Sequence, residues 1–281
     1  MIKVLKPGLY ATVQDLGRFG FHDYGVPNSG VMDEYAMKIA NVRLGNNVND
    51  AVIEMSMIGG VFQFENDTLI SISGADMQPK LNNITIDTNK AIYIKAGDIL
   101  SFSRAITGFR TYIAVKGGIK TPIVMQSRSM YKGVTKQQHL VKNDILPIAV
   151  YNSGANSAHA TLKVDLGYIN SATLSAYKGP EFELLTDKQQ QLLVTLTFSI
   201  SKLNNRMAYQ LTEPLNHNLD AIITAPVLPG TVQLTPSGTL IVLMKDCQVT
   251  GGYPRVLQLQ QNSLNTLAQK QTGQQFSFKL L

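Results

Sequence analysis

The sequence predicts a mainly β protein with a few short helices. Short runs in which apolar and polar residues alternate indicate strands, because successive side chains of a strand point to opposite faces of its sheet. Turn residues such as Asn66, Asn82 and Gly97 separate these runs at a spacing that is typical of sandwiches and barrels. The predicted strands are residues 62–64, 68–73, 84–87, 92–95, 99–102, 231–234, 240–244 and 275–278.

Short helices are predicted at three places. Residues 33–44 carry apolar side chains at helical spacing, and Gly45 follows as a residue that readily ends a helix in the left-handed conformation. A second helix is predicted from Thr186 to about Val194, because Thr-x-x-Gln is a capping-box pattern that satisfies free amides of the first turn. A third short helix is predicted to begin at Ser263.

A weak internal duplication indicates two related β units. Three pairs of segments resemble each other in the same order, at offsets of 172, 170 and 176 residues. The pairs are residues 5–10 with 177–182, 60–70 with 230–241 and 97–102 with 273–278. The alternative explanation is that similar strand-turn-strand sequence patterns occur twice by chance. A real duplication implies a first β unit at residues 1–110, a connecting or exchanged segment at 111–170 and a second β unit at 171–281.

Length and composition indicate a globular protein of about two domains. The chain has 281 residues, of which 44% are hydrophobic and 16% charged, and this balance excludes global disorder. A single cysteine excludes an internal disulfide and a multi-thiolate metal site, and it favours a reducing cytoplasm. Early lysines and Pro7 argue against an export signal. The longest aliphatic run, residues 240–244, is too short to span a membrane.

Charge and motifs exclude several further functions. The 25 basic and 19 acidic residues give a net charge of +6, but the basic residues are scattered, so nucleic-acid binding is not predicted. The four histidines lack metal-binding spacing, so no metal site is predicted. The sequence lacks a phosphate-binding loop and a Gly-x-Ser-x-Gly nucleophile elbow. Cys247 follows an apolar strand, where a buried and inert thiol is expected.

Two polar, glycine-rich segments, residues 12–33 and 245–255, combine hydrogen-bonding side chains with a permissive backbone. Each contains a carboxylate, an amide, an arginine and hydroxyl groups in loops, which together can hold a planar polar ligand. Turn chemistry is the alternative, because aspartates can cap backbone amides, and Arg18 and Arg255 can belong to structural ion pairs.

The first of these segments resembles the opening of the biotin-dependent carboxyltransferase family. That family comprises the C subunit of 5-oxoprolinase, the kinase-inhibitor antagonist of sporulation control and the second subunit of allophanate hydrolase. The chain departs from the family at Asn205, where aspartate is common, and at Cys247, where arginine is common. The matching stretches follow the family's order over nearly the whole chain: residues 4–8, 12–18, 25–27, 29–30, 32–33, 69–76, 96–98, 112–119, 127–129, 205–207, 229–233 and 250–255.

The resemblance implies two cyclophilin-like β-barrel units and an activity that needs partner proteins. As the C subunit of an ATP-dependent 5-oxoprolinase, the chain would act with proteins like the A and B subunits of that enzyme and activate 5-oxo-L-proline for ring opening to L-glutamate. ATP would be shared with those partners. A carboxyltransferase component would instead move carboxyl from carboxybiotin, held on a separate carrier, to urea or another amide. A non-catalytic antagonist would bind an inhibitor of a histidine kinase.

Recognition of a small amide or lactam, with negative charge developing on its oxygen, suits arginine, glutamine and backbone N–H groups. Within the matching stretches and the two polar segments, the candidates for proton transfer in catalysis are Asp15, Asp33 and Asp246. The candidates for substrate binding are Arg18, Ser29, Arg206, Gln233, Gln248, Thr250, Tyr253 and Arg255.

Overall fold

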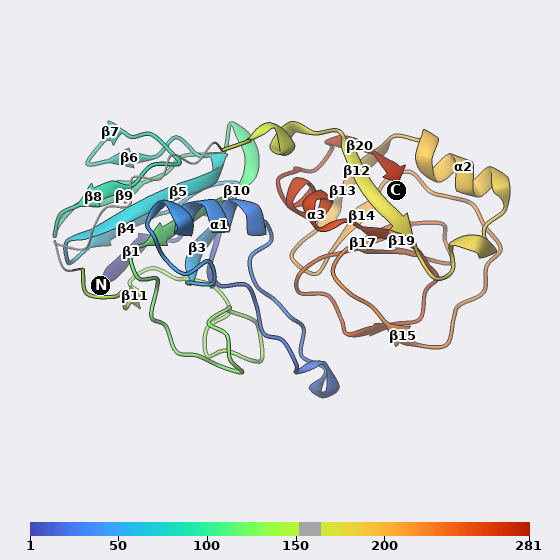
Figure 1. The fold of residues 1–281 in the computed structure, drawn as a ribbon, viewed down its shortest axis with the longest axis horizontal. Coiled ribbons are helices and arrows are strands. Elements are labelled where there is room, and N and C mark those ends of the chain that lie inside the picture. Colours follow the sequence, from blue (N-terminus) through green and yellow to red (C-terminus); the bar gives the residue numbers. More distant parts are fainter. Residues whose placement is uncertain (152–163) are drawn as a thin grey trace. The chain divides into compact units, whose positions relative to one another are not determined.

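The computed structural model describes residues 1–151 and 164–281, and it divides the chain into two compact units (Figure 1). Unit 1 contains Met1–Phe19 and the described residues of Ser29–Ile169. Unit 2 contains Gly20–Asn28 and Asn170–Leu281. Strands dominate both units and the helices are short, so the predicted mainly β fold class is confirmed.

Unit 1 consists of two sheets that share one apolar core. The first has the strand order β11-β1-β4-β9-β6-β7, and the second has the order β2-β3-β10-β5-β8. Val4 and Phe62 of the first sheet and Ile53 of the second are fully buried in this core. The strands are β1 (Ile2–Lys6), β2 (Tyr10–Gln14), β3 (Val52–Ser56), β4 (Val61–Phe64), β5 (Thr68–Asp76), β6 (Lys80–Leu81), β7 (Ile84–Thr85), β8 (Ile92–Ile94), β9 (Ile99–Ser101), β10 (Thr107–Val115) and β11 (Ile145–Leu146).

Helix α1 (Glu34–Arg43) packs against β5 and β10 of the second sheet. Its buried Met37 belongs to a second apolar cluster that includes Tyr112 of β10. Gly45 follows the helix with a φ of 60°, which confirms the predicted left-handed end. The helix therefore holds the segment that precedes it against the face of the second sheet.

Unit 2 is built around a closed barrel of seven strands in the order β12-β19-β16-β17-β14-β13-β20. The barrel is closed by parallel pairing of β12 with β20, in which Thr173 lies opposite Ser277. The barrel strands are β12 (Thr173–Lys178), β13 (Phe198–Asn204), β14 (Ala208–Leu211), β16 (Thr231–Leu234), β17 (Leu240–Leu243), β19 (Arg255–Leu259) and β20 (Gln275–Leu280), and a separate pair is formed by β15 (Ala225–Pro226) and β18 (Thr250–Gly251).

The two other predicted helices lie in unit 2. Helix α2 (Asp187–Thr195) packs against β20, and its N-cap Thr186 forms the predicted capping box with Gln189. Helix α3 (Gln261–Ala268) packs against β12 and begins two residues before the predicted start at Ser263. Single-turn 3-10 helices cover His22–Tyr24, Gly167–Asn170 and Phe182–Leu184.

The duplicated segments form strands in both units, where β1, β4, β5 and β9 correspond to β12, β16, β17 and β20. Their pairing differs, because β4 pairs with β9, whereas β16 pairs with β17 and β19. The repeat is therefore local, since equivalent strands have different neighbours in the two units. The closed barrel occurs in unit 2, and unit 1 forms the two sheets just described.

The compact units differ from the contiguous division into residues 1–110, 111–170 and 171–281 in two places. Strand β10 runs across residue 110, and the described residues up to Ile169 group with unit 1. Residues 20–28 group with unit 2 although they precede most of unit 1 in the sequence. Contacts between segments far apart in the sequence decide this grouping, and a local sequence pattern does not reveal them.

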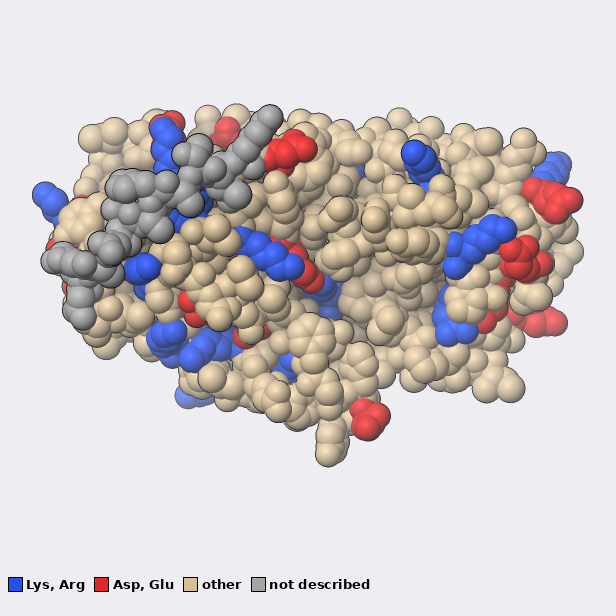
Figure 2. Space-filling view, in the orientation of Figure 1, with Lys and Arg blue, Asp and Glu red and all other residues tan. Residues whose placement is uncertain are grey.

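The charged side chains are dispersed over the surface. On the face shown in Figure 2, lysines and arginines lie at several places, and some of them are next to acidic residues. This distribution agrees with the scattered basic residues of the sequence. No helix in the described ranges is long and apolar enough to cross a membrane.

Candidate functional site

The carboxylate of Asp15 holds a short loop of unit 1 in place. Asp15 follows β2 and is buried. Its Oδ1 accepts hydrogen bonds from the hydroxyls of Ser127 (2.6 Å) and Ser129 (2.7 Å), and its Oδ2 accepts one from the backbone N–H of Arg128 (2.6 Å). The N–H of Gly17 also donates to Oδ1 (2.9 Å). These neutral donors stabilise the buried charge and fix three consecutive residues of the loop.

Arg18 contacts this loop, and the segment that contains Ser29 lies beside the residues that follow Asp15. Arg18 is fully buried, and its guanidinium donates to the carbonyl of Ser129. The next residue after Ser29 is Gly30, whose backbone approaches Leu16 so closely that a Cβ atom would lie 2.7 Å from the Leu16 carbonyl oxygen. Ser29 has a φ of 54°, and its buried hydroxyl lacks a hydrogen-bond partner among the described residues. Backbone strain of this kind concentrates at functional sites.

Asp33 is the N-cap of α1. Its Oδ1 accepts a hydrogen bond from the N–H of Ala36 (3.0 Å), and its Oδ2 accepts one from the hydroxyl of Tyr168 (2.6 Å). The N–H of Asp33 donates to the hydroxyl oxygen of Tyr112 (2.9 Å). Burial, with the charges of Glu54 and Asp33, raises the pKa of Tyr112 well above its ordinary value. Asp33 thus fixes the start of the helix, and its role in proton transfer stays a prediction.

Arg206 and Asp246 form a bidentate ion pair in unit 2. Nε of Arg206 donates to Oδ2 of Asp246 (2.8 Å), and a terminal nitrogen donates to Oδ1 (3.1 Å). The two side chains are 7% and 12% exposed, so the pair is shielded from most solvent. Cys247 follows, and burial, together with the charge of Asp246, raises the pKa of its thiol to about 12. The thiol is therefore protonated and unreactive at neutral pH, as the sequence led us to expect.

Gln233, Gln248 and Arg255 meet on the barrel of unit 2. Gln233 of β16 lies opposite Arg255 of β19, and Nε2 of Gln248 donates to Oε1 of Gln233 (3.3 Å). Nε2 of Gln233 makes a long hydrogen bond to the carbonyl of Tyr253 (3.5 Å). Gly251 makes room for Gln233, because a Cβ atom there would lie 2.4 Å from Nε2 of Gln233. Two amide side chains are thereby held next to an arginine.

Arg255 is itself held by Glu181. Its Nε donates to Oε2 of Glu181 (2.9 Å) and a terminal nitrogen donates to Oε1 (2.8 Å). Hydrogen bonding from Arg255 lowers the pKa of Glu181, so the carboxylate stays charged under mildly acidic conditions. Another terminal nitrogen of Arg255 donates to the carbonyl of Pro226 (3.0 Å). Thr250, in β18, and Tyr253 are exposed in the segment that leads into β19.

The structure thus gathers the predicted residues into separate groups within each unit. Asp15, Arg18 and Ser29 form one group of unit 1, and Asp33 belongs to the network at the start of α1. In unit 2, Arg206 pairs with Asp246, whereas Gln233, Gln248, Thr250, Tyr253 and Arg255 belong to the β15–β19 region. Their roles in catalysis and substrate binding stay predictions.

Sequence reasoning missed the residues that hold these groups together. Ser127 and Ser129 bind Asp15, and Glu181 binds Arg255. The Ser-x-Ser spacing was a signal, since both hydroxyls can reach one carboxylate. The neighbouring sequence, however, does not identify Asp15 as that carboxylate. In the part of the chain that the structure describes, no group of three or more His, Cys, Asp or Glu side chains could hold a metal ion.

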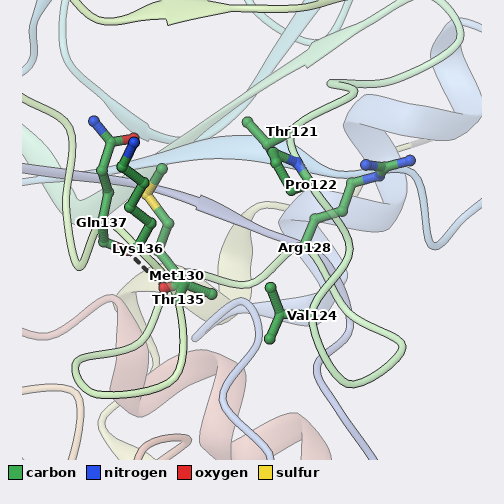
Figure 3. Close-up of a pocket in the computed structure, with 8 residues that line it drawn as sticks. All are labelled: Thr121, Pro122, Val124, Arg128, Met130, Thr135, Lys136 and Gln137. Carbon is green, nitrogen blue, oxygen red and sulfur yellow. Dashed lines mark hydrogen bonds between the residues drawn. The ribbon is translucent and has the colours of Figure 1, made fainter.

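A pocket of about 150 Å³ adjoins the loop held by Asp15 (Figure 3). Met130, Lys136 and Gln137 lie on one side of it in Figure 3, and Thr121 and Pro122 lie on the other. The complete lining is Thr121, Pro122, Val124, Arg128, Met130, Thr135, Lys136 and Gln137. None of the residues predicted from the sequence lines this pocket, but Asp15 binds the backbone of Arg128 in its wall.

The chain is similar in sequence to proteins of known function. The family model described as carboxyltransferase domain, subdomain A and B, matches residues 24–280. The chain is 33% identical to the C subunit of 5-oxoprolinase from Escherichia coli (strain K12), over 99% of this chain and 90% of that protein. It is 29% identical to the same subunit from Haemophilus influenzae, over 99% and 91%. It is 34% identical to urea amidolyase of Lachancea kluyveri, over 64% of this chain and 9% of that protein.

The fold is also found in solved structures. TTHA0988 superimposes with a TM-score of 0.86 at 24% identity, over 99% of this chain and 55% of that one. The urea amidolyase of K. lactis superimposes with a TM-score of 0.86 at 23% identity, over 100% of this chain and 18% of that one. At these identities the likeness concerns the fold alone. The chain thus spans about half of the first solved chain and a small part of the second.

Proposed function

Because the chain belongs to the family of the carboxyltransferase domain, subdomain A and B, we propose that it is the C subunit of an ATP-dependent 5-oxoprolinase complex. The observation that carries this proposal is the match to the C subunit from Escherichia coli over 99% of this chain and 90% of that protein. In this proposal the chain acts in the cytoplasm with partner proteins of the A and B types. It activates the lactam of 5-oxo-L-proline, and ring opening then yields L-glutamate.

Each unit, taken by itself, contains polar groups that can recognise part of a lactam. Gln233 and Gln248 supply amide groups that can pair with the N–H and C=O of a flat amide. The hydroxyl of Ser29 has no partner among the described residues and can donate to an oxygen that gains negative charge. These features support binding and polarisation of the substrate. Asp15, Asp33 and Asp246 stay equal candidates for the group that transfers a proton.

We assign ATP to the partner proteins. Two of the arginines predicted to bind substrate, Arg206 and Arg255, already make bidentate pairs with Asp246 and Glu181. A phosphate would have to displace a carboxylate from either arginine, so these residues do not fit a resident nucleotide.

Carboxyl transfer is the second candidate function. It is favoured by the 34% identity to urea amidolyase over 64% of this chain. In that case the chain accepts carboxyl from carboxybiotin on a separate carrier and passes it to urea or another amide. A third reading, in which the chain only binds an inhibitor of a histidine kinase, predicts partner binding without turnover.

Reconstitution of the complete complex tests these proposals. The purified chain is combined with its A-type and B-type partner proteins, and glutamate release from 5-oxo-L-proline is measured with and without ATP. We expect ATP-dependent release only when all three proteins are present. Equal release without the chain contradicts the proposal. Turnover of urea with a biotin carboxylase and carrier, in place of 5-oxo-L-proline, supports the second candidate.

A pair of serine variants tests the site within that complex. Ser29 and Ser71 are both buried in unit 1, and neither hydroxyl has a hydrogen-bond partner among the described residues. Replacing either by alanine therefore removes no hydrogen bond of the folded chain. We expect S29A to lower ATP-dependent turnover by about tenfold or more and S71A to leave it unchanged. Equal turnover of the two variants contradicts a role for Ser29.

A further inference from the structure

The pocket of unit 1 has the size and the walls to hold a small ring. Its volume is about 150 Å³, and an apolar cavity of about that volume accommodates one benzene molecule in another protein. Pro122, Val124 and Met130 supply apolar surface on its walls. A ligand with an apolar body of five or six ring atoms therefore matches the pocket in size and polarity.

Thr121 adds a polar group that the protein itself does not satisfy. Thr121 is 9% exposed, and its hydroxyl lacks a hydrogen-bond partner among the described residues. An unsatisfied buried hydroxyl is unfavourable, and a molecule bound in the pocket can supply its partner. Rotation between staggered conformations lets the threonine present this hydroxyl to a bound molecule.

Lys136 adds a positive charge at the exposed side of the pocket. Its ammonium group makes no ion pair or hydrogen bond within the described ranges, and the side chain is exposed next to Gln137. An ammonium group without a carboxylate partner can bind the carboxylate of a ligand. The guanidinium of Arg128 points away from the other lining side chains in Figure 3, so we assign it no contact with the ligand.

The wall that carries Val124 is strained and firmly held. Val124 and Ser127 pair across a tight turn, in which Met125 and Gln126 have φ values of 50° and 62°. Such a turn favours Asn and Gly, so Met and Gln adopt it at a cost in free energy. The hydrogen bond from Ser127 to Asp15 holds the end of this turn. The turn therefore gives the pocket a wall of fixed shape.

We propose that this pocket binds a small carboxylate with a ring-sized apolar body, with Lys136 on its carboxylate, Thr121 on a polar ring atom and Val124 and Met130 against the ring. Asp15 acts as a positioning residue by holding the wall. The choice of 5-oxo-L-proline as one member of this class rests on the proposed function. The pocket itself is argued from the Thr121 hydroxyl and the Lys136 ammonium group, both unpaired among the described residues, and from the strained turn, and it is a binding place in unit 1 apart from Ser29, Gln233 and Gln248.

Binding to the full chain is measured with three probes of one ring size. They are 5-oxo-L-proline, cyclopentanecarboxylate, which lacks the lactam, and 2-pyrrolidinone, which lacks the carboxylate. We expect both carboxylates to shift the methyl NMR signals of Val124 and Met130 in a saturable way, and to bind more tightly than 2-pyrrolidinone. No saturation by either carboxylate up to about 10 mM, a very weak affinity, overturns the proposal.

Three variants and one control assign the contacts. K136Q should weaken binding of the carboxylates about fivefold and leave 2-pyrrolidinone unaffected, whereas K132Q, at an exposed lysine outside the pocket, should change neither. T121V should weaken 5-oxo-L-proline without lowering the unfolding midpoint, because the lost hydroxyl has no partner to leave behind. V124F should fill the pocket and abolish binding. If V124F fails to fold, K136Q and T121V still show whether the ligand binds in this pocket.

The results separate this inference from the proposed function. Unchanged binding in K136Q and T121V, or equal weakening of all three probes by K136Q, overturns the pocket assignment. Saturable binding that these variants weaken as expected, in a chain whose reconstituted complex does not release glutamate, supports the pocket and contradicts the proposed function. Full turnover by a complex that contains folded V124F contradicts the pocket as the substrate site and leaves the proposed function intact.

Discussion

Asp15 of unit 1 is held in a different way from Asp246 and Glu181 of unit 2. In unit 1, Asp15 accepts hydrogen bonds from two hydroxyls and two backbone N–H groups, all of them neutral. In unit 2, Asp246 and Glu181 each face an arginine in a bidentate pair. The backbone N–H donors of Asp15 fix its position relative to the main chain. An ion pair fixes a carboxylate relative to one other side chain.

This difference separates two tasks. Asp15 shapes a loop, because its donors belong to consecutive residues 127–129 and to the turn after β2. The pairs of unit 2 neutralise arginines that could otherwise bind an anion, so either arginine must exchange partners before it can hold a substrate carboxylate. We therefore expect changes at Asp15 to alter structure first, and changes at Glu181 to alter mainly the local charge.

The largest effect is expected for Asp15→Ala. The substitution leaves the donors of Ser127, Arg128 and Ser129 without their common acceptor, and each buried donor costs about 1–3 kcal/mol. We expect a loss of about 4 kcal/mol in the free energy of unfolding, measured by urea denaturation. Asp87→Asn is the matched control, because Asp87 pairs with Lys90 on the open surface. A loss below about 1 kcal/mol for Asp15→Ala would refute the structural role.

A smaller effect is expected for Glu181→Gln. The side chains of Arg255 and Glu181 are 18% and 14% exposed, so loss of this charge pair should cost about 1–2 kcal/mol. A double-mutant cycle with Arg255→Met measures the coupling between the two side chains. Additive losses in the cycle would show that the pair contributes nothing beyond its separate contacts.

The same pair predicts a pH dependence. The folded protein lowers the pKa of Glu181, chiefly through hydrogen bonding from Arg255. The stability that this carboxylate contributes is therefore present above its ordinary pKa and is lost as the pH falls through the lowered value. We expect the difference in unfolding free energy between wild type and Glu181→Gln to shrink between neutral pH and about pH 3. A difference that is constant over this range contradicts the assignment.

The sequence predicts the local features of this molecule and not the long-range ones. The capping box of Thr186 and Gln189 could be predicted because both partners lie within one helical turn. The partners of Asp15 in the serine loop lie more than one hundred residues away, and Glu181 lies 74 residues from Arg255. Contacts at such separations depend on strand pairing, which no local pattern encodes. Strands β4 and β16 illustrate this limit, because their sequences match but they pair with different strands.

The smallest effect is expected for Gly251→Ala in unit 2. A Cβ atom at this position would lie 2.4 Å from Nε2 of Gln233, the far end of a flexible side chain. We expect Gln233 to turn away and lose its contact with Gln248 at a cost of about 1 kcal/mol. Gly252→Ala is the matched control, because its nearest atom would lie 3.6 Å away. Substrate binding that falls in Gly251→Ala, with both variants folded, would assign the paired amides to the ligand, whereas unchanged binding would restrict them to packing of the barrel.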